Sequence, residues 1–93
     1  MKPHLKIDDR GNKIYHIEGD ILHREDGPAI EYKDGSKVWS VNGKYHREDG
    51  PAMEFVSSNM FPGGLKLWYY KGHHVQCDNF EYFKHYIKLK AFW

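Results

Sequence analysis

This chain of 93 residues contains one cysteine, Cys77, and no hydrophobic run that approaches the ~18 residues needed for a membrane-spanning helix. One cysteine excludes an internal disulfide framework and fits a reducing compartment. The first residues, Met1-Lys2-Pro3-His4, lack the apolar segment of a signal peptide. We therefore expect a cytoplasmic protein that does not enter a membrane.

The chain also lacks an excess of either charge. It has 14 basic and 13 acidic side chains, for a net charge of +1. Proteins that bind nucleic acid through its phosphates usually carry a clear basic excess, and a DNA mimic would be strongly acidic. The balance disfavours nucleic acid and membrane surfaces as partners, although a local charged patch is compatible with it.

The common motifs of enzymes are missing as well. There is no Gly-x-Ser-x-Gly, no phosphate-binding Gly-Lys-Ser/Thr loop and no Rossmann glycine pattern. Cys77 lies near His74 and just before an expected helix, where a thiol pKa can fall. We nevertheless interpret Cys77 as a small apolar residue that precedes a capping Asp. We predict no catalytic residue and no cofactor.

What the chain does have is an internal repeat. Residues 22–29 return as residues 45–52, with seven consecutive identities, His-Arg-Glu-Asp-Gly-Pro-Ala, at an offset of 23. After each copy comes an aromatic segment that ends in glycine, and a related segment precedes the first copy. These segments are Tyr15-His16-Ile17-Glu18-Gly19, Trp39-Ser40-Val41-Asn42-Gly43 and Trp68-Tyr69-Tyr70-Lys71-Gly72. Residues 3–76 therefore contain three repeat units.

Each unit has the pattern of a β-hairpin. Residues 29–33 alternate apolar and polar side chains, and the pairs Asp34-Gly35 and Asn42-Gly43 are signals for two-residue type I′ turns. Short strands that alternate with such turns predict an antiparallel meander of about six to nine strands.

The C-terminal segment, residues 78–93, has a helical pattern instead. Asp78 and Glu81 are spaced as in a capping box. The apolar side chains that follow recur at helical spacing and form a broad stripe: Phe80, Tyr82, Phe83, Tyr86, Ile87, Leu89, Ala91 and Trp93. A helix near residues 79–91 would bury this stripe against one face of the sheet. We therefore predict one α+β domain, residues 1–93, in which an antiparallel β-meander of repeated hairpins packs on one C-terminal α-helix.

The repeated His-Arg-Glu-Asp cluster has a structural and a chemical interpretation. The aspartates that precede Gly-Pro are suited to fixing a turn, and a cluster that recurs with every unit is typical of turn chemistry. The same residues could bind a divalent cation, but the histidine spacings match no recognised zinc pattern. We favour turns and predict no metal site.

The repeat resembles short tandem repeats of uncharacterised bacteriophage and bacterial proteins that look like distant relatives of MORN repeats. The resemblance covers residues 3–76 and rests on the seven-residue motif, the Asp-Gly turn and Trp-x-Val-Asn-Gly. It implies a β-sheet of repeats, a phage or prophage setting and no enzyme activity. MORN-type repeats act as interaction scaffolds, and small phage proteins often inhibit host machinery. The chain departs from the pattern in its first unit, which lacks the acidic centre, and in its third, which carries an insertion at residues 57–64.

Aromatic side chains and the inserted loop are the candidate binding features. Exposed aromatic residues beside arginine are typical of interface hot spots, and apolar side chains in an inserted loop are costly unless they pack or bind. The candidate partner-binding residues are Trp39, Arg47, Met60, Phe61, Trp68 and Tyr70.

We expect a non-enzymatic protein-binding module, in concrete form a phage-encoded inhibitor that occludes a bacterial host enzyme or defence complex. Unpaired strand edges leave homodimerisation open. Two alternatives stay open: a small-ligand or nucleotide binder that uses Arg24, Arg47 and the histidines, and a metal-dependent hydrolase that uses the His-Glu-Asp clusters.

Overall fold

A computed structural model of the protein describes residues 2–90, in which ten short strands precede one helix. The elements are β1 (His4–Ile7), β2 (Lys13–Ile17), β3 (Ile21–Leu22), β4 (Ile30–Glu31), β5 (Lys37–Val38), β6 (Ser40–Val41), β7 (Lys44–Tyr45), β8 (Met53–Phe55), β9 (Leu65–Tyr70), β10 (His73–Val75) and α1 (Phe80–Lys90). The antiparallel sheet and the C-terminal helix confirm the α+β prediction. The strands outnumber the expected six to nine because residues 36–41, which lie between the two predicted turns, form two strands, β5 and β6, that are separated at Trp39 and pair with different partners.

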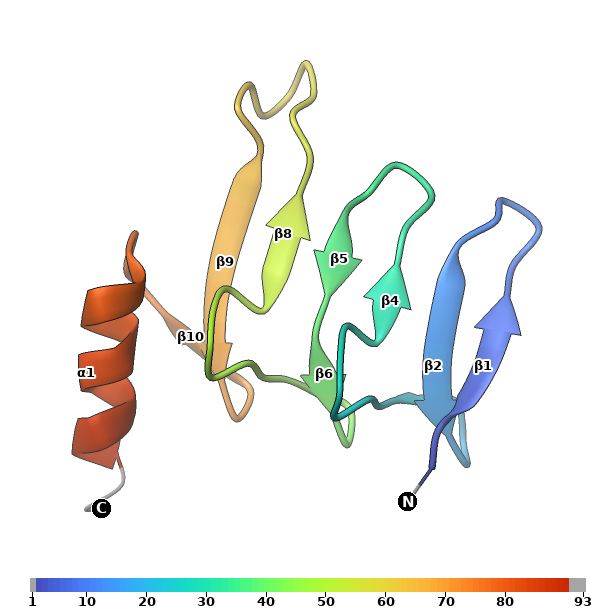
Figure 1. Cartoon of the computed structure of the whole chain (residues 1–93), viewed down its shortest axis with the longest axis horizontal. Helices are drawn as coiled ribbons and strands as arrows, with labels where there is room; N and C mark the ends of the chain where they lie inside the picture. Colours follow the sequence, from blue (N-terminus) through green and yellow to red (C-terminus); the bar gives the residue numbers. More distant parts are fainter. Residues whose placement is uncertain (1, 91–93) are drawn as a thin grey trace.

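The strands stand side by side in one row (Figure 1). The main sheet has the order β1-β2-β4-β5-β8-β9-β10, with β3 paired to β2, and the hairpin β6-β7 forms a separate small sheet. Every pairing is antiparallel. The molecule measures 41 × 37 × 17 Å, so the sheet is broad and thin.

An apolar row crosses the centre of the main sheet and forms part of its core. It consists of directly opposed residues on β2, β4, β5, β8 and β9: Ile14, Ile30, Val38, Met53 and Leu67. Val38 and Met53 in the middle of the row are buried, and the outer members are half-buried. Since adjacent strands contribute one side chain each, the row ties five strands together on one face.

The neighbouring row, on the opposite face, alternates in charge. Its members are Lys13, Glu31, Lys37, Glu54 and Lys66, each directly opposite the next. Cross-strand pairs of opposite charge each contribute about 0.2–1 kcal/mol. A slip of one residue would exchange the charged and apolar rows between the two faces, so the two rows together fix the strand register.

One of the two predicted turns has the expected form. Asn42 and Gly43 have φ of 53° and 81°, and a type I′ turn requires the left-handed region at both positions. The prediction of a two-residue turn at Asp34-Gly35 was wrong. The Tyr32 N–H donates to the Ser36 carbonyl oxygen (2.9 Å), which leaves three residues in the loop, and only Gly35 among them has a positive φ (98°).

The helix α1 lies at the β9–β10 end of the row rather than over a face of the sheet (Figure 1). Phe83 is fully buried and packs with Trp68 and Val75, while Phe80, Tyr82 and Leu89 remain exposed. The structure therefore differs from the expected helix that covers one face with a broad stripe. Ala91 and Trp93 lie outside the described residues. No helix among residues 2–90 has the length and apolar character required to cross a membrane.

The helix begins one residue later than the sequence indicated. The side chain of Asn79, rather than Asp78, accepts a hydrogen bond from the Tyr82 N–H (2.8 Å), the geometry of an N-cap. Asp78 instead accepts a hydrogen bond from the Asn79 side-chain amide (3.1 Å). Glu81 therefore stands outside the capping box and forms an exposed ion pair with Lys84.

Candidate functional site

The two His-Arg-Glu-Asp-Gly-Pro-Ala segments, residues 23–29 and 46–52, are called the first and second motif loops. The first joins β3 to β4, and the second joins β7 to β8. Both motif loops begin with the same backbone hydrogen bond to the preceding hairpin. The N–H of His23 donates to the Tyr15 carbonyl oxygen, and the N–H of His46 donates to the Trp39 carbonyl oxygen. The identical sequences therefore occupy equivalent positions after two hairpins.

The motif histidines connect each hairpin to the next one. Nδ1 of His23 accepts the Asn42 N–H at 2.9 Å, and Nδ1 of His46 accepts the Lys71 N–H at 2.9 Å. Asn42 and Lys71 both have positive φ, so each donor is the first residue of a tight turn. A neutral imidazole that accepts at Nδ1 carries its proton on Nε2. Neither nitrogen is then available as a metal ligand, and this argues against the hydrolase alternative.

Each motif arginine is held in the same network. Arg47 donates from Nε to Asp49 (2.9 Å) and from Nη1 to the Pro51 carbonyl oxygen and Glu54 (both 3.0 Å). Its guanidinium lies 3.7 Å from the centre of the Trp39 ring.

Arg24 makes the equivalent contacts, but each of its distances is longer than that of Arg47. Its distances are 3.1 Å to Asp26, 3.2 Å to the Pro28 carbonyl oxygen and 3.5 Å to Glu31, and it lies 4.0 Å from the Tyr15 ring centre. Both arginine charges are matched within the chain, an arrangement that does not favour an anionic ligand or nucleotide here.

No motif loop follows the third hairpin, β9–β10, and the helix takes the place of one. The ring of Phe83 lies 5.0 Å from that of Trp68, where the equivalent Tyr15 and Trp39 meet arginines. Val75 stands opposite Trp68, at the position that His23 and His46 occupy at the ends of the other two hairpins. The aromatic residue on the first arm of each of these three hairpins, Tyr15, Trp39 or Trp68, is therefore covered, twice by a guanidinium and once by a helix side chain.

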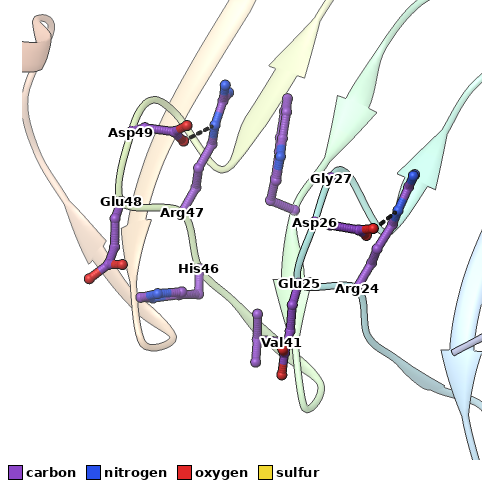
Figure 2. Close-up of a pocket in the computed structure, with 10 residues that line it drawn as sticks. Arg24, Glu25, Asp26, Gly27, Val41, His46, Arg47, Glu48 and Asp49 are labelled. Carbon is purple, nitrogen blue, oxygen red and sulfur yellow. Dashed lines mark hydrogen bonds and ion pairs between the residues drawn. The ribbon is translucent and has the colours of Figure 1, made fainter. Parts of the chain in front are cut away.

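A groove of about 640 Å³ lies between the two motif loops. Figure 2 shows the two loops side by side, with Glu25 and Asp26 on the first and Glu48 and Asp49 on the second; Glu48 extends from the side of its loop that is away from the first motif loop. The groove is lined by Arg24, Glu25, Asp26, Gly27, Trp39, Val41, His46, Arg47, Glu48 and Asp49. The sequence marked the two copies of the motif but did not indicate that they would form the two walls of one groove.

Charge in this groove is unevenly compensated. Asp26 and Asp49 are each paired with an arginine. Glu48 has no ion pair within residues 2–90, and Glu25 faces only His23, with 3.6 Å between Oε1 and Nε2. Each wall therefore carries one carboxylate without a cationic partner.

The inserted loop, residues 57–64, joins β8 to β9 at the ends of the strands that lie away from the motif loops (Figure 1). Met60 is 81% exposed and Phe61 is 43% exposed at its tip. Gly64 has a φ of 87°, and a Cβ added there would lie 2.6 Å from the carbonyl oxygen of Phe55. The loop conformation therefore requires glycine at this position.

The six predicted partner-binding residues do not form one surface. Trp39 and Arg47 stack on each other beside the groove, while Met60 and Phe61 lie on the inserted loop. Trp68 is only 6% exposed and belongs to the helix core, so the expectation that it would be accessible to a partner is corrected. Tyr70 is half-buried beside Tyr86, with 6.4 Å between ring centroids.

Two observations on residues 2–90 concern metal ligands and the cysteine. No group of three or more His, Cys, Asp or Glu side chains in this range is arranged to hold a metal ion. Burial raises the pKa of the Cys77 thiol, and the neighbouring charge of Asp78 raises it further. A raised pKa keeps the thiol protonated and unreactive near neutral pH. The interpretation of Cys77 as a packing residue fits this environment.

In comparisons with known proteins, no family model, no curated protein and no solved structure matches the chain.

Proposed function

We propose that this chain is a non-enzymatic protein-binding module that uses the inserted loop as its principal contact. In its concrete form, it is a phage-encoded inhibitor that occludes a surface of a bacterial enzyme or defence complex. The resemblance to MORN-like repeats of phage and bacterial proteins supports this form, since such repeats serve as scaffolds. The observation that carries the proposal is an internally bonded loop with apolar side chains turned to solvent.

The backbone of this loop is held by its own hydrogen bonds. The carbonyl oxygen of Phe61 accepts the N–H of Ser58 (3.1 Å) and of Gly64 (2.8 Å). The Ser58 hydroxyl accepts the Phe61 N–H (3.1 Å), and the Ser57 hydroxyl accepts the Gly63 N–H (3.0 Å). A loop ordered before binding loses less conformational entropy when a partner docks.

The side chains at the tip supply what a protein partner would bury. Met60 is unbranched and adapts to irregular surfaces, and Phe61 offers a large aromatic area. Exposing both on one ordered loop is unfavourable in water. Burial against an apolar pocket would recover about 1.5–3 kcal/mol for Met60 and less for Phe61, which is already more than half covered. Steric occlusion needs no chemistry beyond such contacts.

A pull-down from bacterial lysates with tagged protein, followed by mass spectrometry, tests the proposal. The test variant is Met60→Ser/Phe61→Ser. The control is Tyr82→Ser/Leu89→Ser, which removes exposed apolar side chains of similar size from the helix surface. We expect one bacterial complex to be enriched by the wild-type and control proteins and lost with the loop variant.

The captured protein is then purified and titrated with the wild type. Stoichiometric loss of its activity would support an inhibitor. Enrichment of the same complex by the loop variant would rule out the loop as the contact, and absence of any specific partner across lysates would refute the proposed function.

A further inference from the structure

One face of the main sheet carries a continuous apolar patch. Successive side chains of a strand point to opposite faces, so the register of the central strands places seven apolar side chains on the same side: Ile14, Ile30, Val38, Met53, Phe55, Leu65 and Leu67. We call these seven residues the apolar face. Among the paired residues of the main sheet on this side, Lys6 on the edge strand β1 is the only Lys, Arg, Asp or Glu.

No helix or strand of residues 2–90 forms a second layer over the apolar face. Figure 1 looks down the shortest axis of the molecule, and neither a helix nor a second sheet covers β4, β5 or β8 in that view. The helix α1 packs on the other side, because Phe83 contacts Trp68 and Trp68 points away from the side of its neighbour Leu67. Stable domains pack two layers against each other, so a second layer for this face has to come from another molecule.

The surface area of the chain is larger than that of a compact monomer of its mass. The chain exposes 6748 Å², whereas a monomeric protein of 11.1 kDa exposes about 5,700 Å². The difference of about 1,000 Å² is close to the ~800 Å² that each partner buries in an interface of standard size. The molecule measures 41 × 37 Å along its two longer axes, so one face offers enough area for such an interface.

We propose that a second copy of the chain covers the apolar face, so that two sheets pack face to face in a homodimer. A twofold axis brings a patch against itself, which requires a self-complementary surface. An apolar patch without charges meets this condition, since no like charges are brought together. Two sheets packed in this way lie about 10 Å apart with their side chains interdigitated. Five of the seven residues are half-buried in the single chain and would become buried in the dimer.

The opposite face is less suited to such a contact. Its central row alternates between lysine and glutamate, and its aromatic residues Tyr15 and Trp39 are already covered by Arg24 and Arg47. A charged partner finds groups to pair with there, whereas the apolar face offers it none. The proposed dimer uses neither Met60 nor Phe61, so it is independent of the loop contact proposed above.

Sedimentation equilibrium and light scattering of the purified chain test the proposal across a roughly hundredfold range of concentration, because the dimer fraction depends on concentration. The test variant is Ile30→Glu/Leu67→Glu. The control is Leu5→Glu/Ile7→Glu, which makes the same change in charge on β1, on the opposite face, where the two side chains are 50% and 60% exposed. Circular dichroism establishes that both variants are folded. The control also reports on pairing through the free edge of β1.

We expect the wild type and the control to approach twice the chain mass of 11.1 kDa as concentration rises. The test variant should remain folded and monomeric, with a dimer dissociation constant raised at least about 100-fold, because like charges would face each other across the interface. A wild type that stays monomeric would overturn the proposal and leave the face to a different protein. Dimers in both variants, or loss of the dimer only in the control, would overturn it as well.

A second measurement uses the wild type alone and does not depend on how the variants fold. A sample mixed from methyl-labelled and unlabelled chains gives nuclear Overhauser effects between the two copies. We expect these effects at the methyl groups of Ile14, Ile30 and Leu67 and none at those of Leu5 and Ile7. The reverse pattern would place the contact at the β1 edge and refute a face-to-face dimer. Neither experiment bears on the loop variant of the pull-down, so the two proposals fail independently.

Discussion

Replacing Arg47 by alanine should destabilise the fold more than replacing Arg24, although the two residues belong to identical motifs. Arg47 makes three hydrogen bonds of 2.9–3.0 Å and stacks at 3.7 Å on Trp39, whereas the contacts of Arg24 are 3.1–3.5 Å long with a stack at 4.0 Å on Tyr15. Hydrogen bonds and stacking weaken with distance. The two arginines therefore form a natural matched pair.

The magnitude follows from the exposure of each partner. The Arg47 side chain is 19% exposed, but that of Asp49 is 82% exposed, so solvent reduces this ion pair to about 0.5 kcal/mol. The bonds to the Pro51 carbonyl oxygen and Glu54 contribute about 1 kcal/mol each, and the stack on Trp39 contributes about 0.5–1 kcal/mol. We expect Arg47→Ala to lower the free energy of unfolding by about 3 kcal/mol and Arg24→Ala by about 1.5–2 kcal/mol.

Urea unfolding followed by far-UV circular dichroism measures both losses. A loss of about 3 kcal/mol corresponds to roughly 12–24 °C in Tm for a domain of this size, so thermal scans provide a second measure. Arg47→Lys keeps the charge but loses the planar fork, and it should recover less than half of the loss. A cost below about 1 kcal/mol for Arg47→Ala, or a larger cost for Arg24→Ala, would refute this account of the motif.

Three further predictions concern the inserted loop, the helix and the cysteine. Gly64→Ala should cost at least about 2 kcal/mol of unfolding free energy in a urea titration, because its Cβ would meet a backbone oxygen at 2.6 Å. Gly63→Ala should cost only about 1 kcal/mol, because the same positive φ is accompanied by open space; equal costs would contradict the close approach. Phe83→Ala should cost about 3–5 kcal/mol by the same assay and Leu89→Ala less than about 1 kcal/mol, since the first side chain is fully buried and the second is 51% exposed; similar values would mean that the helix does not dock through Phe83. Alkylation of the Cys77 thiol by iodoacetamide should be slower at pH 7 than that of a free cysteine peptide and should increase as the pH rises beyond 9.0, because its pKa is raised; a rate that levels off below pH 8 would indicate a lowered pKa instead.

The features that the sequence predicted well depend on local chemistry. Asn42-Gly43 forms its turn because two neighbouring residues accept positive φ, and residues 80–90 form a helix whose buried residue, Phe83, lies on the expected stripe. Antiparallel pairing follows from the short strands and turns between them. These properties depend on residues within a few positions of each other.

The features that it missed depend on contacts between distant residues. The bond from the Asn42 N–H to His23 spans 19 residues, and that from the Lys71 N–H to His46 spans 25. The sequence motif led us to interpret these histidines as part of a turn or as candidate metal ligands, and not as acceptors of backbone N–H groups from the next hairpin. Trp68 was expected to be accessible for the same reason, since nothing near it in the sequence indicates that Phe83 covers it.

The position of α1 also has a consequence for solubility. A sheet assembled from similar hairpins has no intrinsic length, and an open edge is a template on which other molecules can polymerise. By packing Phe83 where a third motif loop would lie, the helix terminates the series within the chain itself. At the other end, β1 carries Lys6 and follows Pro3, and charge and proline on an edge strand both oppose further pairing. The two ends thus act as stops of different kinds, and together they give an otherwise extensible sheet a finite size.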